Sequence, residues 1–446
     1  MITSMSLANF KSWSRVDVPL GRISVFFGAN SSGKTSLLQA LLALKQTSAS
    51  FDRRQAFDFG EEGKEQNFVV LGTFRDVVHQ HEITRPISVQ LSWNPIVPAP
   101  LGENVTASAI MYEVEWSALQ DDVIVNRIQY RTTDVQFDLK RRSTTKFPLY
   151  QWSLSRSGQD HPELNSIISP PDSCYGIPRE LARTAIDIDL LEFNHQFELL
   201  MERIAYLGPL REYPHRHYTW TGAAPQTIDP RGRGAIEALL AAERQSGNGK
   251  LHSATSSIVE RVASWLSRFE LAEQFQLTPI DRERRIYEAR LQTQGADAII
   301  TDVGFGVSQI LPIIVLLHFV PEGSIVVLEQ PEIHLHPLVQ AEMADLFLEI
   351  AHERNLQLII ESHSEHLLRR LQRRIAEAEL PLASPEFIRL YFCELSSQGS
   401  TLRQVETDMF GSILNWPEHF FGDEAGDLDA MTRAALRRKK ELMSRG

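Results

Sequence analysis

The chain has 446 residues, of which 43% are hydrophobic and 23% are charged, a composition that excludes a disordered or fibrous protein. At this length we expect a large core divided between two or three domains. The formal net charge of -12 excludes a protein that binds nucleic acid over its whole surface, so any contact with DNA or RNA requires a local basic patch.

Two further classes of protein are excluded by cysteine content and hydropathy. Cys174 and Cys393 lie far apart and predict neither a disulfide framework nor a zinc site. The longest apolar run, residues 310–320, is interrupted by Pro312 and His318 and is well short of the roughly 20 residues that cross a bilayer. The N-terminal residues are too polar for a signal peptide. We therefore expect a cytoplasmic protein without membrane contact.

The first predicted unit, residues 1–48, consists of a strand, a second strand from Arg22 to Phe27, a glycine-bounded turn and a helix. The helix is indicated by apolar residues at helical spacing, namely Leu37, Leu38, Leu41 and Leu42. A strand, a short loop and a helix in this order form the local structure in which phosphate-binding loops occur.

The turn of this unit matches the pattern G-x-x-x-x-G-K-[ST] in full. Two glycines allow the backbone to wrap closely around an anion, and the helix N-terminus points its N–H groups at the phosphates. Lys34 is expected to reach the β and γ oxygens, and the Thr35 hydroxyl to bind Mg²⁺. The sequence therefore predicts an ATP site formed by Gly28, Ala29, Asn30, Ser31, Ser32, Gly33, Lys34, Thr35 and Ser36.

Residues 67–157 predict a β-rich insertion. Polar and apolar residues alternate in segments such as Ile87–Trp93 and Val123–Tyr130, a pattern typical of half-buried antiparallel strands. Residues 158–179 collect Ser, Gly, Pro and Asp, and predict a long exposed loop.

A mainly helical insertion is predicted next, over residues 158–297. Helical spacing occurs at Ile186–Leu207 and at Ser253–Leu271, and the Gly-, Pro- and Arg-rich segment 208–234 between them has no clear period. A β-hairpin is predicted between Phe275 and Ile300.

The last part of the chain predicts the rest of an ATPase core. Three short apolar strands, Ile325–Leu328, Leu356–Ile360 and Phe387–Phe392, alternate with helices, which indicates a parallel sheet covered on both faces. The tail after residue 370 shows a single strand and a basic end. We therefore expect an α/β fold with a mixed or parallel core sheet built from residues 1–66 and 298–395, and a short C-terminal region, residues 396–446.

A second glycine turn precedes the apolar helix that is predicted to start at Ile310. Two glycines at a helix start can bind an anion through backbone N–H groups. Because the first loop already accounts for one nucleotide, Gly304, Gly306 and Ser308 are interpreted as a lid for the nucleotide of a second copy. The alternative is an ordinary tight turn between hairpin and helix.

Two of the apolar strands end in polar residues that suit phosphate chemistry. Glu329 follows four apolar residues, and at the carboxyl edge of the sheet it is expected to bind Mg²⁺ directly or through water. His363 follows the next strand and could contact the γ-phosphate or the attacking water, although a histidine of this kind can also serve as a structural hydrogen-bonding group.

These elements, in this order, resemble ABC-type ATPases of the RecF, SMC and OLD-like branch. The segment Leu7–Ser12 is similar to the N-terminal strand of that branch, and Lys11 and Ser12 are expected beside the nucleotide. Gly304–Gln309 resembles a degenerate signature sequence, Glu329 corresponds to the Walker B metal ligand, and His363 to the switch histidine.

A closer resemblance is to bacterial predicted ATPases with a C-terminal domain of unknown function, found among anti-phage ATPases. It rests on Glu329–Pro337, Glu361–His366, Tyr206–Arg211 and Asn415–Pro417. The resemblance implies a homodimer or higher homo-oligomer in which ATP joins the subunits and controls a separate effector protein from the same operon. The OLD-like nuclease domain is not expected, because residues 370–446 show only a single strand and a basic end.

One residue departs from the resemblance. Most ABC-type enzymes place a glutamate after the Walker B acid as general base, and this chain has Gln330, which cannot accept a proton at neutral pH. Either Glu332 or His363 positions the water, or hydrolysis is slow and ATP acts mainly as a clamp.

Two other functions remain open at this point. A DNA-repair or clamp ATPase of the RecF kind would bind duplex DNA, and a non-hydrolysing ATP-binding scaffold is compatible with Gln330. The candidate basic contacts for DNA or for an effector are Arg211, Arg216, Arg231 and Arg233, together with the terminal Arg437–Lys440.

Overall fold

A computed structural model describes residues 1–63, 67–94, 108–142, 149–156, 159–160, 167–183, 190–247, 257–293, 295–377, 387–416 and 430–438. Part of the predicted loop 158–179, the first residues of the predicted helices 186–207 and 253–271, and the chain end 439–446 lie outside the described residues.

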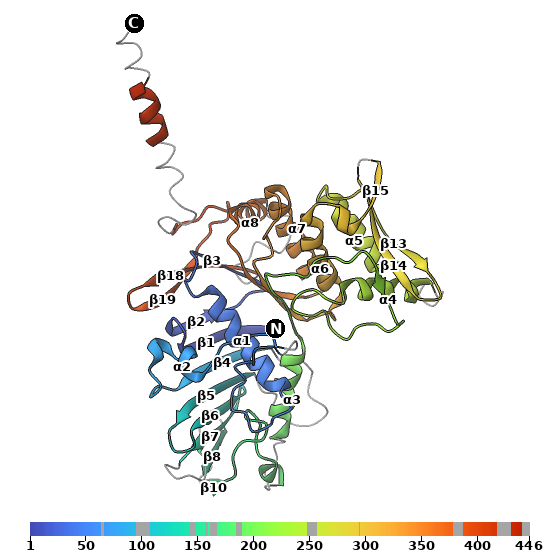
Figure 1. The fold of residues 1–446 in the computed structure, drawn as a ribbon. Coiled ribbons are helices and arrows are strands. Elements are labelled where there is room, and N and C mark those ends of the chain that lie inside the picture. Colours follow the sequence, from blue (N-terminus) through green and yellow to red (C-terminus); the bar gives the residue numbers. More distant parts are fainter. Residues whose placement is uncertain are drawn as a thin grey trace.

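A six-stranded mixed sheet lies at the centre of the molecule (Figure 1). Its first five strands are parallel and the sixth is antiparallel to its neighbour. The order is β11 (Ile204–Leu207), β16 (Ile325–Glu329), β17 (Gln357–Glu361), β3 (Ile23–Gly28), β18 (Ile388–Ser396) and β19 (Gly399–Val405). The expected α/β fold with a mixed core sheet is confirmed.

The core strands separate two hydrophobic cores, because successive side chains of a strand point to opposite faces. In β16, Ile325 and Val327 pack into one core and Val326 and Leu328 into the other. The first core contains α1 (Lys34–Ala49) and α3 (Leu191–Glu202). The second contains α4 (Ala235–Gly247), α5 (Ile258–Arg268), α6 (Phe305–Phe319), α7 (Pro337–Glu353) and α8 (Glu365–Glu377).

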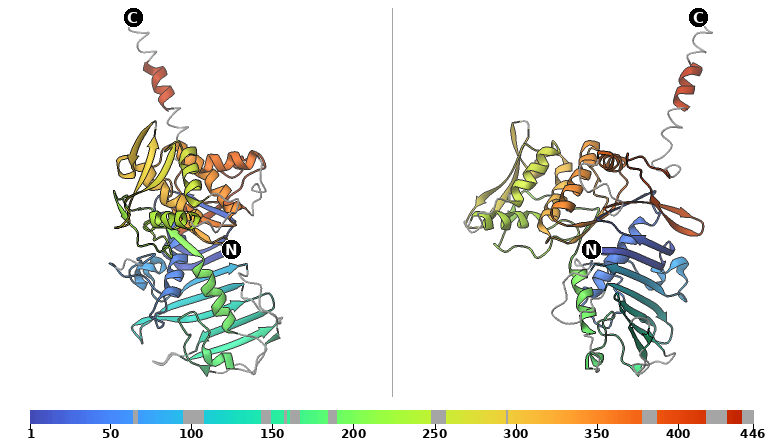
Figure 2. Two further views of the ribbon diagram at one scale, coloured as in Figure 1. Left: turned by 90° about the vertical axis from the view of Figure 1, so that its right-hand side faces the viewer. Right: turned by 180° about the vertical axis from the view of Figure 1, so that it is seen from behind.

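A nine-stranded antiparallel sheet packs on the α1 side of the central sheet (Figures 1 and 2). Its strands alternate buried and partly buried residues, as expected for a sheet with one face on the core. They are β1 (Ile2–Phe10), β2 (Trp13–Pro19), β4 (Ile87–Trp93), β5 (Ala109–Ser117), β6 (Asp122–Arg131), β7 (Val135–Arg141), β8 (Tyr150–Arg156), β9 (Gln159–Asp160) and β10 (Ile167–Ile168). Because β1 pairs with β4, this sheet joins the start of the chain to the predicted β-rich insertion.

A smaller sheet packs against α5 (Figure 1). It contains β12 (Tyr218–Thr219), β13 (Gln274–Asp281), β14 (Ile286–Thr293) and β15 (Ala296–Ile299), so that the predicted hairpin is present and β12 and β15 are added to it. The short helical turns are α2 (Phe74–Val77), η1 (His79–His81), η3 (Arg179–Arg183) and η4 (Ile300–Asp302).

Some predicted elements are wrong in extent or number. The predicted helix Ile186–Leu207 ends as α3 at Glu202, and its last four residues form the strand β11. These four residues are too few for their periodicity to distinguish a helix from a strand, and pairing with β16 makes them a strand. The helix predicted to start at Ile310 begins at Phe305 as α6. Strands β2 and β19 and helix α4 were not predicted.

Within the described part of the chain, every helix is too short or too polar to span a membrane.

Candidate functional site

The phosphate loop connects the end of β3 to the start of α1 and is packed too closely for any residue but glycine at its two ends. At Gly28, with a φ of 141°, a Cβ atom would lie 2.3 Å from the Cys393 carbonyl oxygen of the adjacent β18. At Gly33, with a φ of 95°, it would lie 2.6 Å from Ser400 Oγ. Trp13 Nε1 donates a hydrogen bond to the Gly33 carbonyl at 3.0 Å. These contacts fix the loop from three neighbouring segments.

The lysine of the loop is held inside it. Lys34 is buried, and its Nζ donates hydrogen bonds to the Gly28 and Ala29 carbonyl oxygens at 3.0 and 2.8 Å. Burial lowers the pKa of this ammonium, and the charge of Glu361 opposes that shift. Ser32 Oγ is buried without a hydrogen-bond partner among the described residues. A phosphate would give the Ser32 hydroxyl the partner that it lacks and would place an opposite charge beside the Lys34 ammonium.

The remaining predicted nucleotide-binding residues lie in the phosphate loop, at the start of α1 or in the turn between β1 and β2. Ala29, Asn30 and Ser31 are exposed, whereas Thr35 and Ser36 are half-buried. The turn between β1 and β2 carries the two residues expected beside the nucleotide: Lys11 Nζ donates to Gln39 Oε1 at 2.6 Å, and Ser12 Oγ lies 2.8 Å from the position of a Cβ on Gly33.

Two carboxylates meet beside Thr35 at the carboxyl edge of the central sheet. Glu329 ends β16 and Glu361 ends β17, where they are paired in register. Both are buried, and Thr35 Oγ1 donates a hydrogen bond to Glu361 Oε1 at 2.9 Å. Glu361 was not predicted as a site residue, although it follows four residues of a buried strand just as Glu329 does.

Burial and mutual repulsion shift the acidity of these carboxylates. Burial raises the pKa of Glu329 to about 7, with the charge of Glu361 as the second cause, and a hydrogen bond with Tyr206 opposes the shift. The pKa of Glu361 is raised by burial, and its hydrogen bond from Thr35 opposes that shift. Two like charges in a buried site are most stable with a cation between them.

The group of oxygens fits Mg²⁺. Thr35, Glu329 and Glu361 supply a hydroxyl and two carboxylates, which are the hard oxygen ligands that Mg²⁺ prefers. Glu361 Oε2 is buried and has no hydrogen-bond partner among the described residues, so one oxygen is open to a metal ion or its water shell.

The candidate general base, Glu332, lies in the segment that follows β16. Glu332 is buried, its Oε1 accepts a hydrogen bond from the His363 backbone N–H at 2.5 Å, and its Oε2 has no partner within the described residues. Burial raises the pKa of Glu332. Burial also lowers the pKa of His363, which favours a neutral imidazole. Gln330 is tied to β17, since its backbone N–H donates to the Glu361 carbonyl at 2.8 Å.

The second glycine pair lies at the start of α6. Gly304 is the N-cap with a φ of -57°, and Gly306 is in the first turn. Nothing lies within 4 Å of the position of a Cβ on Gly304, and the nearest atom to that of Gly306 is a Leu335 methyl carbon at 3.7 Å. The Ser308 hydroxyl is buried and donates to the Phe305 carbonyl at 2.6 Å, so it is turned toward its own helix.

The predicted basic contacts do not form one surface patch. Arg211, expected at a surface, is only 7% exposed. Arg216 pairs with Asp302 at 2.6 Å, and Arg233 pairs with Glu212 at 3.1 Å. Burial and ion pairing therefore account for Arg211, Arg216 and Arg233, whereas Arg231, Arg437 and Arg438 are exposed.

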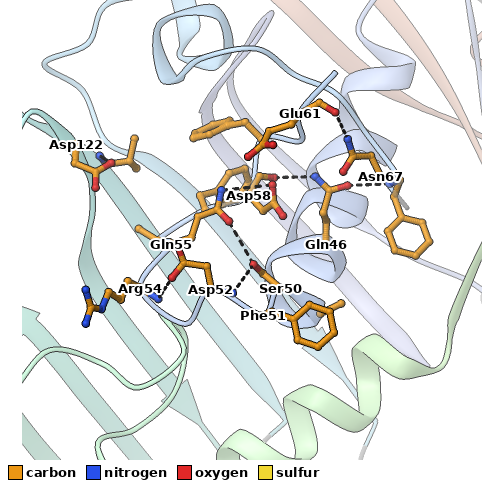
Figure 3. Close-up of a pocket in the computed structure, with 16 residues that line it drawn as sticks. Gln46, Ser50, Phe51, Asp52, Arg54, Gln55, Asp58, Glu61, Asn67 and Asp122 are labelled. Atoms are coloured by element: carbon orange, nitrogen blue, oxygen red, sulfur yellow. Dashed lines mark hydrogen bonds between the residues drawn. The ribbon is translucent and has the colours of Figure 1, made fainter. Parts of the chain in front are cut away.

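A pocket at the other end of α1 is separate from this site. Its polar groups bond mainly to one another (Figure 3): Gln46 Nε2 donates to the Asp58 carbonyl oxygen at 3.3 Å, Gln46 Oε1 accepts from the Phe68 N–H at 2.8 Å, and Asn67 donates to the Glu61 carbonyl. These bonds hold the segment that follows α1 in place, so the polar residues that line the pocket have a structural role.

The sequence matches the family described as AAA ATPase domain over residues 1–151 and 240–368. Residues 384–431 match a second family, described as protein of unknown function (DUF3696). No curated protein matches the sequence.

Solved structures similar to the chain include heads of SMC proteins. The head bound to the C-winged helix domain of ScpA is 12% identical, with a TM-score of 0.46, and covers 91% of this chain and 97% of that chain. The head from Thermotoga maritima is 12% identical, with a TM-score of 0.40, over 91% and 99% of the two chains. The head with an extended coiled coil from Pyrococcus furiosus, bound to the C-terminal domain of ScpA, is 11% identical, with a TM-score of 0.41, over 91% and 96%.

Proposed function

The chain belongs to the family of AAA ATPase domains, and from this premise we propose that it is a nucleotide-dependent dimerisation switch. ATP with Mg²⁺ joins two copies head to tail, and the joined state controls a separate effector protein from the same operon in bacterial anti-phage defence. The observation that carries the proposal is the open start of α6, a second helix N-terminus at which a phosphate could bind, in a chain whose phosphate loop already accounts for one nucleotide.

The two glycines of α6 support a partner's nucleotide at this position. Gly304 has a φ that any residue adopts and free space around it, so neither backbone conformation nor packing within the chain requires glycine there. The first-turn N–H groups of a helix have no intrahelical acceptor and bind anions. A phosphate approaching from a second copy would explain why residue 304 has no side chain, and it would find N–H donors at the start of α6.

The chemistry follows from the residues around the phosphate loop. Bound Mg²⁺ would neutralise charge on the phosphate oxygens. Lys34 would donate to those oxygens in place of the Gly28 and Ala29 carbonyls, and Thr35, Glu329 and Glu361 would hold the metal. Glu332, whose pKa is raised by burial, accepts a proton from the attacking water through its open Oε2. Gln330 can orient that water but cannot take its proton.

A non-hydrolysing ATP-binding scaffold is the second candidate, favoured by Gln330 in the position of the usual base. A RecF-like DNA clamp has less support, because Arg211 is buried and Arg216 and Arg233 are in ion pairs. ATP hydrolysis by the wild type that is lost in Lys34→Ala would exclude the non-hydrolysing scaffold. Strong, salt-dependent binding of duplex DNA to the wild type would favour the clamp.

The dimer is tested at Gly304, where a side chain does not disturb the fold. Aspartate is a favoured N-cap residue, so Gly304→Asp should fold and bind ATP normally, but its charge should repel the partner's phosphate. We expect the wild type to double in mass with ATP and Mg²⁺ and Gly304→Asp to remain a monomer. Gly304→Asn, a cap of equal size without the charge, should dimerise better than Gly304→Asp. Normal dimerisation of the aspartate variant would contradict the proposal.

The effector is tested by co-expression with the neighbouring genes of the operon. We expect one of their products to co-purify with the wild type in ATP and to be lost from Gly304→Asp. A partner retained equally by both proteins would show that its binding does not depend on the joined state.

A further inference from the structure

A buried arginine faces the same edge of the central sheet as the candidate base. Arg211 lies four residues after β11, and Gln330 directly follows β16, its parallel neighbour. Because parallel strands end at a common edge, both segments leave the sheet beside the metal-binding carboxylates. Arg211 Nη2 donates to the Gln330 carbonyl at 3.5 Å.

The position of Arg211 is fixed by the backbone around it. The Gly208 N–H donates to the Pro230 carbonyl at 2.8 Å, and the Glu212 N–H donates to the Arg231 carbonyl at 2.9 Å. The guanidinium is therefore carried on a segment anchored on both sides of residue 211.

The guanidinium keeps unused donors. Its Nε and Nη1 are buried without a hydrogen-bond partner, and no ion pair joins Arg211 to a carboxylate among the residues that the structure describes. Glu332 has an open Oε2 close enough to interact electrostatically with this charge, but the two side chains are not bonded to each other. A buried guanidinium with two unbonded nitrogens is well suited to bind an anionic group.

We propose that Arg211 binds the terminal phosphate of the nucleotide, so that the site distinguishes a nucleoside triphosphate from a diphosphate. Its hydrogen bond to the residue that follows Glu329 puts it at the metal-binding end of the site, where a γ-phosphate lies. This inference rests on the nucleotide site of the proposed function.

The first test compares affinities for ATP and ADP in the presence of Mg²⁺. Arg211→Met removes the charge but fills similar space, and its matched control is Arg282→Met, an exposed arginine in the turn between β13 and β14. A charge-assisted hydrogen bond lost from a buried site should lower ATP affinity roughly tenfold to a hundredfold, with ADP affinity changed less than about threefold. Arg282→Met should bind both nucleotides like the wild type.

A second variant keeps the test decisive if Arg211→Met fails to fold. Arg211→Lys retains a positive charge without the forked donors, and it should lose part of the preference for ATP. An unchanged ratio of ATP to ADP affinity in a folded Arg211 variant would overturn the inference alone. Failure of the wild type to bind either nucleotide would instead overturn the proposed function.

Discussion

The acidity of Glu329 predicts a pH-dependent Mg²⁺ site. The pKa of this carboxyl is raised to about 7, so it is mostly protonated below that pH and mostly ionised above it. Mg²⁺ binds the ionised form, and its affinity should therefore rise about tenfold between roughly pH 6 and roughly pH 8. The affinity of the site for Mg²⁺ falls as the pH falls through the pKa of Glu329, because a proton on the carboxylate competes with the metal ion.

Two substitutions should move this dependence in opposite directions. Tyr206→Phe removes a hydrogen bond that favours the carboxylate and should raise the midpoint by about half to one pH unit. Glu361→Gln removes a neighbouring negative charge and should lower the midpoint, even if it also weakens binding overall.

The assay is a Mg²⁺ titration of nucleotide binding at several pH values, in all three proteins. The nucleotide's own protonation is the same in each, so the difference between midpoints reports on Glu329. A wild-type affinity that does not change with pH, or midpoints that move in the same direction in both variants, would refute the reasoning.

The remaining predictions concern the base. Gln330→Glu should raise the rate of ATP hydrolysis, by up to about 10² to 10⁴ if no other group acts as base in the wild type, and should shorten the lifetime of the ATP-bound dimer. Glu329→Gln should instead weaken Mg²⁺ binding and lower the rate of hydrolysis. Fast wild-type hydrolysis that Gln330→Glu slows would contradict this assignment. Glu332→Gln should lower turnover by about 10² or more while ATP binding is retained; normal turnover in that variant would leave His363 as the group to test.

Much of the site follows from the sequence because its parts are local. The phosphate loop needs only a strand, eight residues and a helix start, and the structure shows all three in place. Glu329 was predictable for a similar reason, since a buried strand ending in an acid places that acid at the sheet edge.

The contacts that depend on tertiary pairing could not be predicted. Tyr206 and Arg211 reach the site because residues 204–207 form a core strand, and those residues also suit the end of a helix. Arg211 was expected at a surface, since an arginine is usually exposed and nothing in the sequence indicates its burial. Trp13 and Ser400 hold Gly33 from segments on opposite ends of the chain.

The central claim, an ATP site that depends on Lys34, is tested most directly by isothermal titration of Mg²⁺ and ATP into the purified protein. We expect binding by the wild type, no detectable binding by Lys34→Ala, and normal binding by Lys140→Ala, which removes an exposed lysine of β7. The first variant loses the buried ammonium that faces the phosphates. Equal affinity of the wild type and Lys34→Ala for ATP would contradict the account.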